Sequence, residues 1–163
     1  MEIKDLITRF SDTRDNQMKA VFSSLFILSN KLQAVFDKHI PEISLKQFML
    51  LVMVRQARGP LSLTQLGELL GCSRQNVKKL AEALAAKEFV TIARSDEDAR
   101  AFVVQMTAKA EAFFVTEFAA YETQLAHLFA DYSDAEMAQL FSLLMRLYDG
   151  VGHLDEEASH GEG

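Results

Sequence analysis

Apolar residues recur at helical spacing along most of the chain, and one short stretch alternates between apolar and polar residues instead. From about Asp12 to Asp37 the apolar residues form a continuous stripe, which Phe26, Ile27 and Phe36 widen beyond a single face. A helix that is apolar around much of its circumference must bury more than one side. We therefore expect this first helix to contact both a core and a second subunit.

Capping signals predict three shorter helices after Pro41. Ser44 with Gln47 and Ser62 with Gln65 match the capping-box pattern, in which each side chain bonds the other's backbone N–H group. The first of these helices is almost entirely apolar, so it should be central, and Gly59-Pro60 should end it. The others should run over residues 62–70 and, from an N-cap serine, over residues 73–87.

The apolar period then changes to two, which predicts a β-hairpin. Val90–Ala93 and Phe102–Met106 read as half-buried strands, joined by a polar loop from Arg94 to Arg100. Two long helices should follow, one capped by Thr107 and reaching about residue 131, and one over about residues 133–149. The last fourteen residues are acidic and rich in glycine, so we expect them to be disordered.

The predicted fold is therefore mainly α-helical with a small β-hairpin. Helices flank a central domain that holds the hairpin. The expected divisions are an N-terminal helical region, the central domain, a pair of C-terminal helices and a disordered acidic tail, at residues 1–43, 44–106, 107–149 and 150–163.

Composition narrows the class of protein. At 163 residues, 49% hydrophobic and 25% charged, the chain has the balance of a soluble globular protein. Its longest apolar run, Phe48 to Val54, is far shorter than the ~20 residues that a membrane-spanning helix needs. The first residues are charged and lack a signal core, and Cys72 is the single cysteine. We expect a cytoplasmic protein with no membrane segment, metal or cofactor.

Charge is distributed unevenly along the sequence. The whole chain has a formal charge of -6, but residues 46–109 hold ten Lys or Arg against six Asp or Glu. That segment is therefore +4, and the remainder is -10. A basic middle within an acidic frame favours a nucleic-acid partner, although a solvated basic face would give the same pattern.

Leu63–Leu80 carries the strongest motif, a helix-turn-helix. Such a motif needs a small residue where its helices cross, which Gly67 supplies, and a residue that tolerates positive φ at the turn, which Gly71 supplies. Apolar residues at the remaining internal places should hold the two helices together. These are Leu66, Leu70, Val77 and Leu80.

The surface left over on the second helix has the chemistry of DNA recognition. Arginine reads guanine, asparagine and glutamine read adenine, and cations neutralise phosphates. We expect DNA contacts from the N-terminal half of this helix, which contains Ser73, Arg74, Gln75, Asn76, Lys78 and Lys79. The alternative is an ordinary polar surface on two amphipathic helices.

The hairpin that follows is interpreted as a wing. Arg94 and Arg100 bracket its loop, and arginine is favoured in a narrow minor groove. Asp98 lies two residues before Arg100, so its carboxylate is placed to orient the guanidinium by a forked pair. Without the preceding motif, the same loop would read as an exposed segment of mixed charge.

These segments resemble the MarR family of bacterial winged-helix regulators. The resemblance is carried by Leu63–Leu80, by Leu84–Val90 and by Arg94–Thr107, in which the Asp98-x-Arg100 pair is the most specific feature. It implies a homodimer joined through the terminal helices. It also implies that the dimer binds a pseudo-palindromic operator, usually as a repressor. A small aromatic or lipophilic effector, or oxidation, would release it from the DNA.

The sequence departs from the family pattern at two positions, and it leaves two alternative functions open. Glu88 and Ala110 stand where the family usually has glycine. Cys72 is either a small buried residue of the turn or a redox sensor. A second alternative is an adaptor whose winged helix binds a protein partner. The sequence contains no catalytic grouping, phosphate loop or HExxH motif that would favour an enzyme.

Overall fold

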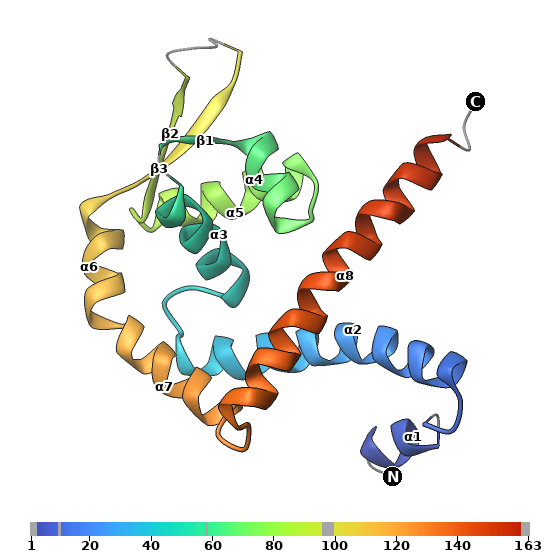
Figure 1. The fold of residues 1–163 in the computed structure, drawn as a ribbon. Coiled ribbons are helices and arrows are strands. Elements are labelled where there is room, and N and C mark those ends of the chain that lie inside the picture. Colours follow the sequence, from blue (N-terminus) through green and yellow to red (C-terminus); the bar gives the residue numbers. More distant parts are fainter. Residues whose placement is uncertain (1–2, 10, 58, 96–99, 161–163) are drawn as a thin grey trace. The chain divides into compact units, whose positions relative to one another are not determined.

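The computed structural model describes residues 3–9, 11–57, 59–95 and 100–160, and most of them are helical (Figure 1). The chain divides into two compact units, Met1–Phe114 and Val115–Gly163. The elements are α1 (Ile3–Thr8), α2 (Arg14–His39), α3 (Leu45–Gln56), β1 (Leu61–Ser62), α4 (Leu63–Leu70), α5 (Arg74–Ala86), β2 (Val90–Arg94), β3 (Phe102–Met106), α6 (Ala108–Thr116), α7 (Phe118–Leu128) and α8 (Asp134–His160). None of the described helices combines the length and apolar character needed to cross a membrane.

Capping side chains fix the starts of α3 and α4 as predicted. At α3 the Gln47 N–H group donates to Ser44 Oγ at 3.3 Å, and the Ser44 N–H group donates to Gln47 Oε1 at 3.1 Å. Ser62 and Gln65 make the same reciprocal pair at α4. Because such pairs satisfy N–H groups that have no partner within the helix, they define where each helix begins.

The hairpin belongs to a three-stranded antiparallel sheet in the order β1-β3-β2. The strand β1 was not predicted, because it has only two residues and pairs with Val103 and Val104, about forty residues further along the chain. The strands β2 and β3 extend past β1, and Figure 1 shows them projecting beyond the helices. The sheet therefore has a base that packs on helices and an end that protrudes.

The core of the first unit lies where α3, α4 and α5 meet the base of the sheet. Leu51, Leu66, Leu84 and Val104 are fully buried there. From α6, the Phe113 ring packs on the Phe89 ring with 5.4 Å between centroids. This contact joins the first part of α6 to the core of the first unit, which runs to Phe114.

The long helix predicted after Thr107 is interrupted, which corrects the prediction. It forms α6 and α7, with Glu117 between them in right-handed helical conformation (φ -92°, ψ -18°). The N–H groups of Ala120 and Tyr121 both donate to the Glu117 carbonyl. The interruption is thus one residue of altered hydrogen bonding, with no proline or glycine to mark it in the sequence.

Two terminal segments are more helical than expected. The short helix α1 precedes the predicted first helix, and α8 continues to His160 through most of the predicted disordered tail. The disorder prediction is wrong for residues 150–160, while residues 161–163 lie outside the described part. Val151 and Leu154 continue an apolar helical stripe, and each glycine in a helix costs only about 1 kcal/mol.

Candidate nucleic-acid interface

Two glycines shape the turn between α4 and α5, as predicted. A Cβ atom on Gly67 would lie 2.8 Å from the carbonyl oxygen of Cys72, closer than real Cβ atoms approach. Gly71 ends α4 in the left-handed region, with φ +63° and ψ +36°. The N–H group of Cys72 donates to the Gly67 carbonyl at 2.9 Å and closes the turn. The sharp angle between the helices therefore depends on the absence of two side chains.

Burial on one side of α5 leaves the predicted recognition residues on the surface. Val77, Ala81 and Leu84 are buried at helical spacing and anchor α5. The polar positions of its first two turns are all exposed, namely Arg74, Gln75, Asn76, Lys78 and Lys79. The structure thus brings these five side chains together on one exposed helical surface.

Ser73 and Lys78 have partners within the protein. The Asn76 N–H group donates to Ser73 Oγ at 3.2 Å, so the serine hydroxyl caps α5. Lys78 Nζ lies 3.6 Å from Glu82 Oε1, and both side chains are more than half exposed. An exposed pair of this kind contributes little to stability, so Lys78 can exchange this carboxylate for a phosphate.

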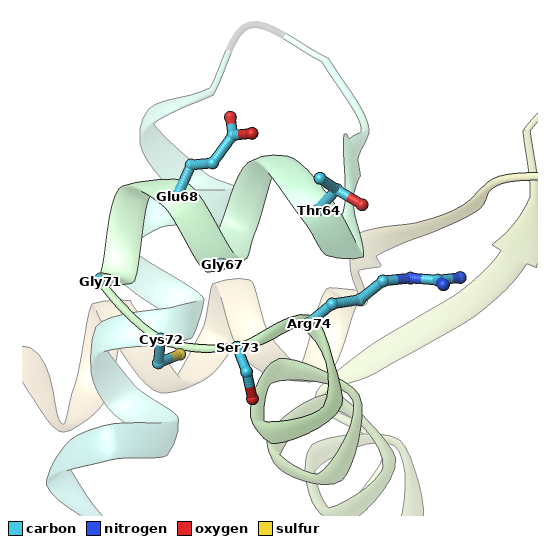
Figure 2. A pocket seen from close by; sticks show the side chains of 7 residues that line it. All are labelled: Thr64, Gly67, Glu68, Gly71, Cys72, Ser73 and Arg74. Atoms are coloured by element: carbon cyan, nitrogen blue, oxygen red, sulfur yellow. The ribbon is translucent and has the colours of Figure 1, made fainter. Parts of the chain in front are cut away.

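An open pocket of about 420 Å³ lies at the elbow of the motif (Figure 2). Its lining includes Thr64, Glu68, Cys72 and Arg74. Figure 2 shows the side chains of Thr64 and Arg74 extending toward the same side of the pocket. Thr64 was not predicted as a site residue, because a polar residue in the first turn of a helix carries no specific signal. Cys72 is half-buried and carries a free thiol.

The helix α5 ends in a Schellman motif built on an unusual residue. Glu88 has φ +64°, the left-handed region that glycine occupies most readily. Its N–H group donates to the Ala85 carbonyl, and the Phe89 N–H group donates to the Leu84 carbonyl, both at 2.9 Å. The departure from the family's glycine therefore leaves the turn intact but places a side chain in a strained conformation.

Side chains from neighbouring elements hold the same junction. Thr107 Oγ1 donates to the Glu88 carbonyl at 2.6 Å, and Lys109 Nζ donates to the Lys87 carbonyl at 2.8 Å. Lys87 Nζ in turn donates to the Glu42 carbonyl at 2.7 Å. The end of α5, the start of the wing and the start of α6 are thereby joined.

The other departure from the family pattern is Ala110, which stands where the family usually has glycine. Its side chain is fully buried on α6.

The wing carries the remaining predicted residues. Arg94 ends β2, and Arg100 lies just before β3, so both cations flank the hairpin loop as expected. Asp98 lies outside the described residues, and its predicted pairing with Arg100 stays a prediction. The guanidinium carbon of Arg94 lies 5.5 Å from the centroid of the Phe102 ring. The contact between Phe102 and Arg94 was not predicted, because it depends on the register of the strands.

Comparison with known proteins identifies the family that this part of the chain resembles. Residues 42–101 match the model of the MarR family. Over 121 residues the chain is 29% identical to an uncharacterised HTH-type transcriptional regulator, YpoP, from Bacillus subtilis (strain 168). That alignment covers 74% of this chain and 82% of the relative.

Solved structures confirm the predicted fold. A MarR/EmrR family transcriptional regulator from Acinetobacter sp. ADP1 aligns with a TM-score of 0.75 at 19% identity, covering 83% of this chain and 96% of that one. The PcaV transcriptional regulator from Streptomyces coelicolor, crystallised with its natural ligand, aligns with a TM-score of 0.65 at 19% identity. That alignment covers 76% of this chain and 91% of PcaV. The mainly helical winged fold is thus shared with these regulators.

Proposed function

Because the predicted resemblance to the MarR family is confirmed over residues 42–101, we infer that the protein is a transcriptional regulator rather than an enzyme. We propose that it binds a pseudo-palindromic operator in double-stranded DNA as a homodimer and represses transcription in the cytoplasm. The observation that carries this proposal is the exposed surface of α5, where cations and amides gather while the opposite side is buried.

The recognition helix is proposed to read bases through its amides and one lysine. Gln75, Asn76 and Lys79 should lie near base edges in the major groove, while Arg74 and Lys78 contact phosphates. Ser73 supports them by capping the helix start. Thr64 is added as a candidate phosphate contact, because it lines the elbow pocket together with Arg74.

The wing is proposed to place Arg100 in a minor groove, with Asp98 orienting it and Arg94 acting at the loop end of the strands. Arg100→Ala should make the slope of log K against log salt concentration shallower by about 0.9 for each phosphate no longer neutralised, or about two per dimer. Asp98→Ala should weaken binding less, although it makes the protein more positive. Tighter binding by Asp98→Ala at every salt concentration would show that this pair is only a surface charge pattern.

A second copy of the chain is the proposed partner of α2 and α8. Both helices expose large apolar side chains in the single chain, and Phe22 and Phe26 on α2 are 65% and 60% exposed. Exposed apolar surface of this extent marks an interface. A two-fold dimer would present two recognition helices to half-sites about 34–36 Å apart.

Control by a small aromatic or lipophilic effector is proposed from the family resemblance and from the ligand-bound structure of the neighbour PcaV. An effector of this kind must bind one spacing of the recognition helices more tightly than another. Oxidation of Cys72 is the alternative, since this half-buried thiol lines the elbow pocket. Loss of the peroxide response in Cys72→Ser, with no response to phenolic compounds, would favour the alternative.

Binding to mixed-sequence duplex DNA in low salt tests the proposed function. The wild-type protein should be retained, whereas an adaptor that uses its winged helix for a protein partner should not. Alanine at Gln75, Asn76 or Lys79 should cost about 1–3 kcal/mol on a selected operator and relax one position of its sequence. Lys46→Ala on α3 removes an exposed charge outside the proposed DNA surface and the proposed dimer interface, and it serves as the control for Lys79→Ala. Equal losses on every DNA sequence would contradict the assignment of base contacts.

A further inference from the structure

The last rung of the wing pairs an arginine with an aromatic residue. Along β2 and β3 the directly opposed residues are Val90 with Met106, Ile92 with Val104, and Arg94 with Phe102. Opposed residues in an antiparallel sheet project to the same face. The fully buried Val104 marks this as the face that packs on the helices. The strand β1 stops opposite Val103, so the third rung extends beyond it.

The two side chains of that rung contact each other in the geometry of a cation–π pair. The guanidinium carbon of Arg94 is 5.5 Å from the Phe102 centroid, within the distance at which a ring attracts a cation. Phe102 is 39% exposed, so core packing alone does not account for a phenyl ring here. A guanidinium held over a ring keeps its N–H donors, and a phosphate oxygen can accept hydrogen bonds from them.

We propose that Phe102 is a positioning residue for DNA binding, which holds the Arg94 guanidinium ready to bind the phosphate backbone beside the wing. This inference rests on the proposed function, because it assumes that the wing meets DNA. The ring restricts the many rotamers of an exposed arginine before DNA arrives. Less side-chain entropy is therefore lost on binding, and affinity rises without a new contact.

Four variants of the protein test this role. Phe102→Leu removes the ring but keeps an apolar residue, and Phe102→Tyr keeps the ring. Arg94→Gln removes the cation, and a double variant combines Arg94→Gln with Phe102→Leu. Thr91→Val, at an exposed position on the opposite face of β2, is the matched strand control. Binding to a fluorescent 25-base-pair duplex of mixed sequence would be measured by anisotropy, with thermal melting to check folding.

The expected result is coupling between the two positions. Phe102→Leu should weaken binding about two- to fivefold for each wing that touches DNA, and Phe102→Tyr and Thr91→Val should bind as the wild type does. In the Arg94→Gln background, Phe102→Leu should change nothing further. A purely structural role predicts equal losses in both backgrounds together with a lower melting temperature, and that result would overturn the inference.

Proton NMR provides a readout that does not depend on DNA. Stacking on the ring should shift the Arg94 δ protons upfield in the wild type and in Phe102→Tyr, but not in Phe102→Leu. Absence of this shift would overturn the inference even if the wild type binds DNA. If the shift is present and the wild type binds no duplex, the proposed function fails and the positioning role fails with it. Binding by the wild type with no loss in Phe102→Leu overturns the positioning role alone.

Discussion

The helix-turn-helix and the outer helices differ in how much of their apolar surface one chain buries. Leu66 and Val77, at the centre of the motif, are 0% exposed, whereas Phe22 on α2 is 65% exposed and Leu154 on α8 is 66% exposed. The motif is therefore complete within a single chain, and its stability should not depend on association. The outer helices leave apolar surface exposed, which the proposed second chain would cover.

The largest effect should come from opening a cavity in the motif. Leu66→Ala should lower the free energy of unfolding by about 2–5 kcal/mol, because the side chain is fully buried on α4. Leu69→Ala on the same helix is the control, since that side chain is 58% exposed and its loss should change stability by under about 0.5 kcal/mol. Denaturant unfolding of both variants would check the difference. Equal losses would mean that α4 buries both of its sides.

A charge in the stripe of α8 should break the dimer without unfolding the motif. Leu147→Glu should weaken association by about 3 kcal/mol, close to 100-fold, because each copy would bury an unpaired carboxylate. Ser142→Glu adds the same charge on the other side of the helix and should leave association unchanged. Sedimentation velocity over a concentration series measures both variants. A dimer that tolerates Leu147→Glu would remove α8 from the proposed interface.

Adding a methyl group should have opposite effects in the two regions. Gly67→Ala should destabilise the protein by about 1–3 kcal/mol, because its Cβ would meet the Cys72 carbonyl at 2.8 Å. In Gly150→Ala the new Cβ meets nothing within 4 Å, and the change should stabilise α8 by about 0.5–1 kcal/mol. Thermal melting gives both signs. A neutral Gly67→Ala would show that the two helices can separate slightly at no cost.

A small gain in stability should come from the C-terminal end of α5. Glu88→Gly should stabilise the protein by about 1 kcal/mol, because glycine adopts φ +64° without the steric penalty of a side chain. Glu88→Asn should give part of that gain, since asparagine tolerates this region better than glutamate. Denaturant unfolding checks the order of the three proteins. A loss in Glu88→Gly would mean that the Glu88 side chain contributes more than its conformation costs.

The motif was predictable because its signals are local. The capping pairs at Ser44 and Ser62 involve residues three positions apart, and the roles of Gly67 and Gly71 follow from their places beside the turn. These features need no knowledge of distant segments. The exposed residues of α5 then followed from helical spacing alone.

What the sequence did not reveal depends on partners far along the chain or on weak local signals. The strand β1 exists because β3 pairs with it, and the Arg94–Phe102 contact needs the hairpin register. The interruption at Glu117 has no glycine or proline to mark it. In α8 the glycine-rich composition suggested disorder, although the apolar spacing through Leu154 continued the helix.

One chain holds a complete helix-turn-helix, while two chains are proposed to make the functional unit. Measuring the mass of the protein with and without DNA tests this claim most directly. Sedimentation equilibrium at micromolar concentration should give twice 18.3 kDa for the free protein, and one such dimer on each operator duplex. Leu147→Glu should give a folded species of 18.3 kDa that still binds mixed-sequence DNA weakly. A wild-type protein that stays at 18.3 kDa both free and on DNA would contradict the account.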